Sequence, residues 1–391
     1  MVSGCGADEP ARSTTAGDIG AVLDRRAAAV LHHDTEAYLA GTAPGARALR
    51  EAQRTELANL ADVPLSSWTY EVREVTGKGA GRATAEVELR YRIKGFDTAP
   101  LTTRRTMELT RDGSRWYLTA DRPAKGAAEQ LWQQGEVAVV RGSHALVLGV
   151  GRTGAELRAI RDDADRAVPA VSAAWQRTWA GRIVVLVPRS VEDMGALLAS
   201  SADSYRGIAA VTTGGVGGTG EPPALADRVI VNPEAYAGLT PFGRRVVLTH
   251  ETTHVATRPR TSAATPLWLS EGFADWAAYR AEDRDAEVIA PELAEAVRAR
   301  EAPAALPADA DFAFDGEADA LAQAYEGGWL ACAMIADRWG EEKLTAFYRA
   351  VGAHHGRDGA VEQALSEVLS TTEADFTADW RDYVRDRLGR A

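Results

Sequence analysis

The stretch TPFGRRVVLTHETTHVATRP, residues 240–259, carries the two histidines around which the rest of the chain is organised. Its opening Thr-Pro pair is typical of a helix start, because threonine caps free amide groups and proline fits the first helical position. On a helix, residues four apart lie about 40° apart around the axis and one turn along it. His250 and His254 therefore point the same way and can hold one metal ion. Glu251 lies about 100° around from His250, where a general base for a metal-bound water belongs.

A second helix is expected in TPLWLSEGFADWAAYRAED, residues 265–283, where apolar residues recur at helical spacing. It carries Glu271 near its middle and follows the first helix after a short loop over 258–264. Two helices joined by so short a loop can pack antiparallel and face a carboxylate toward the histidines, which supplies the third protein ligand of a zinc site. Asp275 lies one turn beyond Glu271 and is placed to accept a hydrogen bond from a zinc-binding histidine.

HETTH followed by WLSEGFAD resembles the gluzincin zinc metallopeptidases, the thermolysin and aminopeptidase-like clan. The resemblance implies one zinc ion held by His250, His254 and Glu271. It also implies that Glu251 takes the proton of the attacking water and that Asp275 orients a histidine. The spacing from the second histidine to the glutamate is slightly shorter than in the best-known members, which affects the connecting loop and not the ligand set. The extra histidine of the metzincin pattern is absent.

The helix expected over AYEGGWLACAMIADRWGEEKLTAFY, residues 324–348, extends this resemblance, because related gluzincins carry a tyrosine at the head of such a helix. The Tyr325 hydroxyl would then donate to the oxyanion of the tetrahedral intermediate. Alternatively, Tyr325 caps a core helix and its hydroxyl has a structural partner. The gluzincin-like unit covers 136–391, with a small mixed sheet, the active-site helix and a mostly helical C-terminal part. We expect a zinc-dependent hydrolase acting on peptide or protein substrates. The competing hypothesis is a catalytically silent, zincin-like lipoprotein that binds or regulates.

Composition limits the remaining classes of function. The chain has 391 residues, of which 46% are hydrophobic and 26% charged, enough for two or three globular domains. The formal net charge is −12 and no basic run accumulates, which argues against nucleic acid as a partner. No apolar run approaches the roughly 18 residues of a membrane-spanning helix.

The first residues, MVSGC, resemble the lipobox of a bacterial lipoprotein, in which the cysteine becomes the lipidated first residue. The resemblance implies an extracytoplasmic protein anchored to the membrane through Cys5. The charged and apolar signal regions that should precede a lipobox are missing, so either the start is trimmed or the match is accidental. The polar residues 1–16 are expected to form a flexible tether. Cys332, the only other cysteine, is expected to be a small buried residue.

Residues 17–122 are expected to form a separate α+β unit. Helical sequence is followed by four alternating stretches that predict antiparallel strands at 67–76, 81–95, 100–113 and 114–122. A curved sheet wrapped around helices resembles the NTF2-like domains, and the closing DGSRWYL is the most similar piece. No catalytic motif accompanies it. We expect a spacer, a partner-binding or propeptide-like module, or a unit with its own ligand pocket.

A linker helix is expected over 123–135, followed by a strand over 136–150. The sequence G-x-G-x-x-G at 149–154 suggests a dinucleotide site, but the next strand, 181–190, ends in Pro-Arg-Ser and lacks the required acid. A turn is the better interpretation. Residues 207–213 and 227–236 predict an antiparallel edge pair, and the first of them is our candidate for the strand that binds peptide substrate. The Gly-rich loop between them is either a flap over the cleft or a hairpin without a role.

Overall fold

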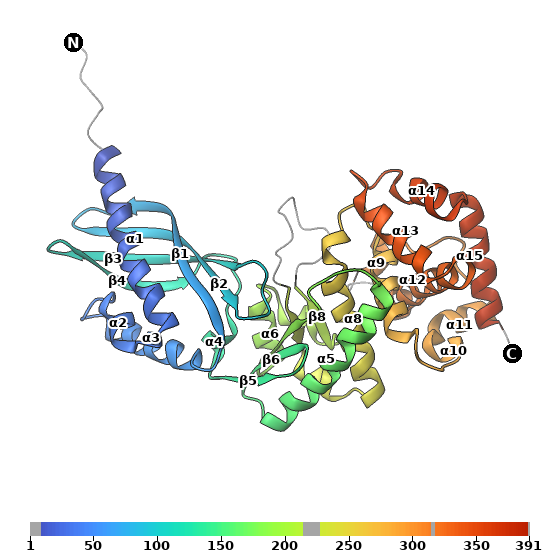
Figure 1. Cartoon of the computed structure of the whole chain (residues 1–391), viewed down its shortest axis with the longest axis horizontal. Coiled ribbons are helices and arrows are strands. Elements are labelled where there is room, and N and C mark those ends of the chain that lie inside the picture. The colour runs from blue at the N-terminus through green and yellow to red at the C-terminus, as the bar shows by residue number, and fades with distance from the viewer. Residues whose placement is uncertain (1–8, 214–226, 314–316, 390–391) are drawn as a thin grey trace, which may run out of the picture.

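The computed structural model describes residues 9–213, 227–313 and 317–389 (Figure 1). The molecule is elongated, with a helix-and-sheet unit at one end, a second sheet and its helices in the middle, and a group of helices at the other end. Two sheets and many helices confirm the predicted α+β class. Cys5 and the Gly-rich loop 214–226 lie outside the described residues, so the lipobox and flap stay predictions.

The first unit consists of three helices followed by an antiparallel sheet in the order β1-β2-β3-β4. Its elements are α1 (Glu9–Leu31), α2 (Thr35–Ala40), α3 (Arg47–Asn59), β1 (Leu65–Gly77), β2 (Arg82–Ile93), β3 (Leu101–Asp112) and β4 (Arg115–Pro123). The four predicted strands are confirmed. The tether predicted over residues 1–16 is wrong in its second half, because α1 begins at Glu9. Pro10 falls in the first turn of α1, where proline is tolerated because its missing amide hydrogen would have no partner in the helix.

Strand β2 shows why this sheet has a single packed face. Every second residue of the strand is buried, from Ala83 to Ile93. Helix α1 covers one end of that face through Ile19 and Leu23. At the other end, Leu89, Tyr91 and Ile93 belong to a cluster that continues into the second sheet. The resemblance to NTF2-like domains stays a prediction.

The second sheet has five strands in the order β5-β6-β7-β9-β8. They are β5 (Val137–Arg141), β6 (Ala145–Val150), β7 (Ile183–Val187), β9 (Val229–Val231) and β8 (Ala210–Thr212). The three central strands are parallel and both outer strands are antiparallel to their neighbours, which confirms the small mixed sheet and the β8–β9 edge pair.

The single strand predicted over 136–150 is wrong, because the chain reverses between β5 and β6. The Asp165 carboxylate accepts hydrogen bonds from the backbone amides of Ser143, His144 and Ala145 at 2.8–2.9 Å. Three amides gathered on one carboxylate hold the chain in a turn that strand alternation alone does not predict.

The predicted linker helix is also largely wrong, because only α4 (Leu131–Gln134) is helical within 123–135. The G-x-G-x-x-G segment forms a turn between β6 and α5, as the sequence predicts. Gly151 adopts a positive φ of 64°, and α5 (Gly154–Trp175) begins with a capping box formed by Thr153 and Glu156. A Cβ on Gly149 would overlap the Leu157 side chain, so this glycine allows close packing of strand and helix.

The rest of the described chain is mostly helical. The helices are α6 (Val191–Leu197), α7 (Pro233–Ala237), α8 (Pro241–Thr257), α9 (Leu267–Tyr279), α10 (Ala286–Ile289), α11 (Pro291–Ala299), α12 (Ala318–Trp339), α13 (Glu341–Ala353), α14 (Ala360–Ala364) and α15 (Glu373–Leu388). The helix expected over 324–348 is interrupted at Gly340, whose φ of 91° ends α12. Cys332 is fully buried, as predicted. Within the described ranges, none of the helices has the length and hydropathy needed to cross a bilayer.

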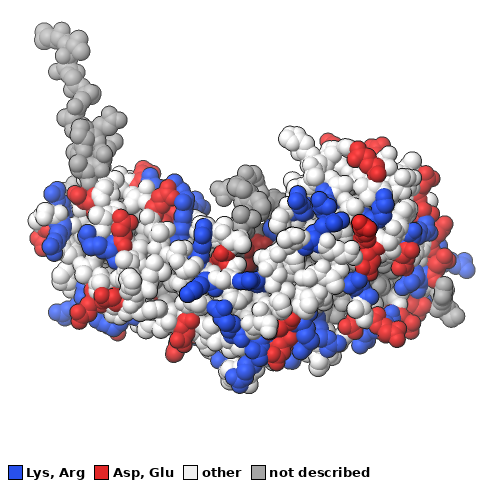
Figure 2. All heavy atoms as spheres, in the orientation of Figure 1, with Lys and Arg blue, Asp and Glu red and all other residues white. Residues whose placement is uncertain are grey.

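The two units share a core. Trp68 and Tyr91 of the first sheet pack on Trp132 with ring centres 5.5 and 5.0 Å apart. A buried ion pair reinforces this contact, since the Arg228 guanidinium donates to both carboxylate oxygens of Asp97 at 2.7 and 2.8 Å. The first unit is therefore packed firmly against the second. On the face drawn in Figure 2, acidic and basic side chains are interspersed over both units.

Candidate active site

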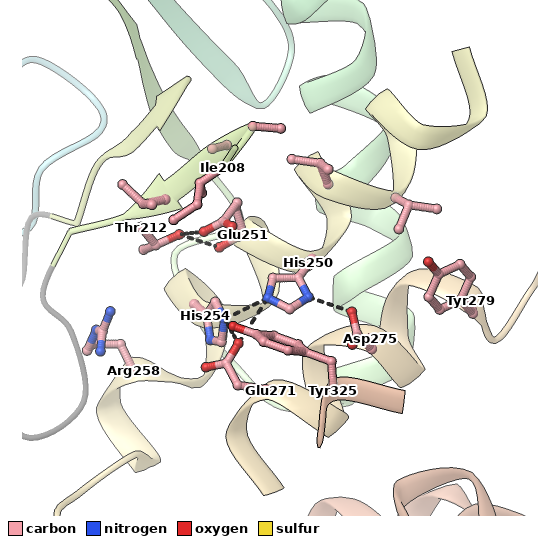
Figure 3. A pocket seen from close by; sticks show the side chains of 15 residues that line it. Ile208, Thr212, His250, Glu251, His254, Arg258, Glu271, Asp275, Tyr279 and Tyr325 are labelled. Atoms are coloured by element: carbon pink, nitrogen blue, oxygen red, sulfur yellow. Dashed lines mark hydrogen bonds and ion pairs between the residues drawn. The ribbon is translucent and has the colours of Figure 1, made fainter. Parts of the chain in front are cut away.

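Helix α8 forms one wall of a cavity of about 440 Å³ that also touches β8, α9 and α12. The helix begins as the sequence predicts, because the Thr240 hydroxyl accepts a hydrogen bond from the Gly243 amide and Pro241 takes the first helical position. Leu248 and Ala256 are buried and attach the helix to the interior. His250 and His254 line the cavity together (Figure 3).

The two histidines and Glu271 bring three ligand atoms together. The Nε2 atoms of His250 and His254 lie 3.1 Å apart, and Glu271 Oε2 lies 3.2 and 3.3 Å from them. A tetrahedral zinc ion with bonds of about 2.0–2.2 Å needs ligand atoms separated by roughly 3.3–3.6 Å, close to this triangle. Two neutral imidazole lone pairs at this distance repel each other unless a proton or cation lies between them. The residues therefore fit a metal ion.

Glu271 reaches the histidines because α9 packs against α8, and α9 also crosses α12 closely. A Cβ on Gly272 would overlap the backbone of Gly328, so only glycines allow this approach. The crossing brings Glu271, on α9, and Tyr325, on α12, into one cavity. Burial raises the pKa of Glu271, but His254 and His250 outweigh burial and keep it well below its usual value. The carboxylate is therefore ionised and can act as a ligand.

Asp275 orients His250. Its Oδ1 accepts a hydrogen bond of 2.8 Å from Nδ1 of His250, which leaves the Nε2 lone pair facing the ligand triangle. Burial lowers the pKa of His250, but Asp275 and Glu271 outweigh burial and hold it above its usual value. Asp275 thus lies where the sequence pattern predicts.

Glu251 lies in the same cavity without belonging to the ligand triangle. Its side chain is buried, and burial raises the pKa of its carboxyl group, an effect that His250 and His254 partly offset. The Thr212 hydroxyl, from edge strand β8, donates to Glu251 Oε2 at 2.7 Å (Figure 3). Sequence reasoning placed β8 beside the cleft but did not find this contact, because an Ala-Val-Thr strand carries no signal of a partner 39 residues away.

Tyr325 lines the cavity, with its ring centre 6.4 Å from that of His250, and its side chain extends toward the histidines (Figure 3). The prediction that Tyr325 heads its helix is wrong. Helix α12 begins at Ala318, because the Ala- and Leu-rich segment before the tyrosine is itself a good helix former. The ring packs edge-on against Phe312, with centres 5.1 Å apart. Burial and the carboxylates of Glu271 and Asp275 raise the pKa of Tyr325 well above its usual value, so its hydroxyl stays protonated.

These contacts define a class of site, a His-His-Glu group that could hold a metal ion, with an adjacent buried carboxylate and a protonated tyrosine. No protein-family model matches the chain, and no curated protein matches it in sequence.

Comparison with solved structures finds a variant of an M1 zinc metallopeptidase from Deinococcus radiodurans, and a second structure of this variant bound to a Tyr-Ser-Ala substrate. Sequence identities are 14% and 15%, both TM-scores are 0.32, and the matches cover 79% and 82% of this chain. The chain spans 62% and 70% of the length of those structures. A SEC-C motif-containing protein from Rhodopseudomonas palustris matches 28% of this chain and 90% of its own, at 20% identity and a TM-score of 0.21. TM-scores this low carry no argument about the site. Its assignment therefore depends only on the geometry of the residues in this chain.

Proposed function

We propose that the protein is a gluzincin-type, zinc-dependent peptidase that hydrolyses peptide bonds. The observation that carries the proposal is the triangle of His250, His254 and Glu271 ligand atoms, with the Glu251 carboxylate in the same cavity. A single zinc ion bound there would supply an activated water molecule and would polarise the scissile carbonyl.

The chain's own residues perform the proton transfers. Glu251 accepts the proton of the attacking water and delivers it to the leaving amine. The Thr212 hydroxyl restrains the Glu251 carboxylate during both transfers. Tyr325 donates its hydroxyl hydrogen bond to the developing oxyanion, a role that requires the protonated state favoured by its raised pKa.

Edge strand β8 provides the surface on which the peptide binds. Ala210, Val211 and Thr212 all line the cavity, and β8 is the outermost strand of its sheet. A peptide that pairs with this edge would pass the ligand triangle as one more strand of the sheet.

The test compares wild-type protein with Glu251→Gln on a mixed peptide library, both loaded with zinc. We expect equal zinc content and cleavage by the wild type alone, because the substitution removes only the proton acceptor. Equal cleavage by both proteins would refute the assignment. No cleavage by either protein would favour the alternative, a zincin-like protein that only binds.

We further propose that the protein is extracytoplasmic and held at the membrane by a lipid on Cys5, supported by the resemblance of MVSGC to a lipobox. Metabolic labelling with palmitate tests this when the protein is expressed from its own gene in its native bacterial host. The label should appear in the wild type and disappear in Cys5→Ser, and an unlabelled wild type would reject the proposal.

A further inference from the structure

A second cavity, of about 370 Å³, is lined in part by Tyr325. It shares Asp275, Tyr279 and Tyr325 with the cavity that contains the ligand triangle, so the two spaces adjoin. Its remaining walls come from α10 and α12. They are mostly apolar and include Ile289, Leu321, Ala322 and Trp329.

The lining carries little free charge at neutral pH. Asp275 is already hydrogen-bonded to His250. The Glu326 carboxyl group is turned away toward the start of α11, where it accepts a hydrogen bond of 2.6 Å from the Leu293 amide. Burial and the neighbouring Glu292 raise the pKa of Glu326 to about 9, so the Glu326 carboxyl group is uncharged near neutrality. Apolar contact is therefore the main interaction that the cavity offers.

The guanidinium of Arg258, which also lines the metal cavity, already has hydrogen-bond partners within the protein. Arg258 lies one turn beyond His254. Its guanidinium donates to Asp227 at 2.9 Å and to the carbonyl of Thr213 at 3.1 Å. Because this positive charge is paired with a buried carboxylate, it favours an acidic substrate side chain less than a free arginine would.

The second cavity is within reach of a peptide at the metal site. The ring of Tyr325, which lines both cavities, is centred 6.4 Å from that of His250. An extended peptide advances about 3.3–3.6 Å per residue, so a residue about two positions from the bond at the ligand triangle reaches Tyr325, at the edge of the second cavity. Tyr279 and Trp329 line it with ring centres 5.9 Å apart in an edge-to-face arrangement, which leaves aromatic surface for a third ring.

We infer that this cavity is a specificity pocket that takes a large apolar side chain, preferably an aromatic one, from the bound peptide. The inference rests on the proposed function for the peptide's position, yet binding can be measured without cleavage. The reason for the preference is the hydrophobic effect, since transfer of a Phe or Leu side chain from water into an apolar cavity favours binding by at least about tenfold.

The experiment uses zinc-loaded Glu251→Gln and short blocked peptides that differ at one position, which is Phe, Ala or Asp and is moved along the peptide. Isothermal titration measures affinity. We expect Phe to bind at least about tenfold more tightly than Asp at one position only. Ala322→Trp, which fills the cavity, should abolish that preference. Ala320→Trp, on the exposed side of the same helix, should keep it and serves as the matched control.

A second variant tests the pocket in case Ala322→Trp does not fold. Leu321 is partly exposed, so Leu321→Arg should be tolerated and should move the preference from Phe toward Asp. Equal binding of the three peptides at every position would overturn the inference, as would a Phe preference that survives Ala322→Trp and Leu321→Arg. A pocket-dependent preference in binding, together with absent cleavage by the wild type, would sustain the pocket and refute the peptidase.

Discussion

The hydroxyl of Thr212 donates a hydrogen bond of 2.7 Å to the carboxylate of Glu251 and lies 3.0 Å from the backbone carbonyl of the same residue. It joins edge strand β8, where we place the substrate, to the proposed general base on α8. Through this contact, the strand proposed to bind the peptide would also restrain the proposed general base.

Thr212→Val removes this hydrogen bond while keeping the shape of the side chain. A hydrogen bond to a charged group contributes about 1.5–3 kcal/mol, so kcat should fall about 10- to 100-fold with little change in KM. Zinc content should be unchanged. Steady-state peptide cleavage measures the effect, and Thr212→Ser, which restores the hydroxyl, should recover most of the activity. A wild-type kcat in Thr212→Val would show that Glu251 needs no such restraint.

Asp275→Asn should weaken metal binding. The Asp275 carboxylate accepts from Nδ1 of His250 at 2.8 Å, and loss of such a partner typically lowers metal affinity about 10- to 100-fold. Competition with a chelator of known zinc affinity provides the measurement. Asp283→Asn, at an exposed position beyond the end of α9, is the matched control and should bind zinc as the wild type does. Equal affinities in both variants would argue that His250 is held by packing alone.

Gly272→Ala should destabilise the protein, because the added methyl group would overlap Gly328 at the crossing of α9 and α12. Overpacking of this kind costs about 1–3 kcal/mol, and the shift should also lower zinc affinity by moving Glu271. Urea unfolding with and without zinc tests both effects. Gly356→Ala, where nothing lies within 4 Å of the added atom, should be nearly neutral. A stable Gly272→Ala protein with normal zinc affinity would mean that the crossing is not tight.

Glu326→Gln should remove a pH dependence of stability. The folded pKa of Glu326 is raised from 4.5 to about 9, so the folded state binds a proton that the unfolded state has lost between these values. The contribution of this residue is fully present below the unfolded pKa and disappears as the pH rises through the folded pKa. Glutamine imitates the protonated acid and keeps an acceptor for the Leu293 amide.

The measurement is the difference in Tm between Glu326→Gln and the wild type at about pH 5, 7 and 9. The variant should gain stability relative to the wild type as the pH rises, because other groups contribute equally to both proteins. Parallel curves would place the pKa of Glu326 near its ordinary value. Glu317→Gln, exposed at the start of the same helix, controls for the loss of one charge.

Local sequence pattern was sufficient to predict the structure wherever the interacting groups lie on one helix or strand or follow one periodicity. The common direction of the two histidines of α8 was predicted from their spacing of four on a helix. The start of α8 was predicted from its Thr-Pro cap. The meander of the first sheet follows from strict alternation, most clearly in β2, where every second residue is buried. These features depend on neighbours a few residues away, which the sequence displays directly.

Long-range contacts decided what the pattern did not predict. The β5–β6 reversal depends on Asp165, some twenty residues further along, and the carboxylate of Glu251 is held by Thr212 from another element. The apolar cavity beside Tyr325 is lined by residues of α9, α10 and α12, which the sequence does not show to be neighbours. Local spacing thus specified which chemical groups the site contains. Packing between distant segments decided their distances and the space left for a substrate, because side-chain volumes and hydrogen-bond geometry act only after the chain has folded.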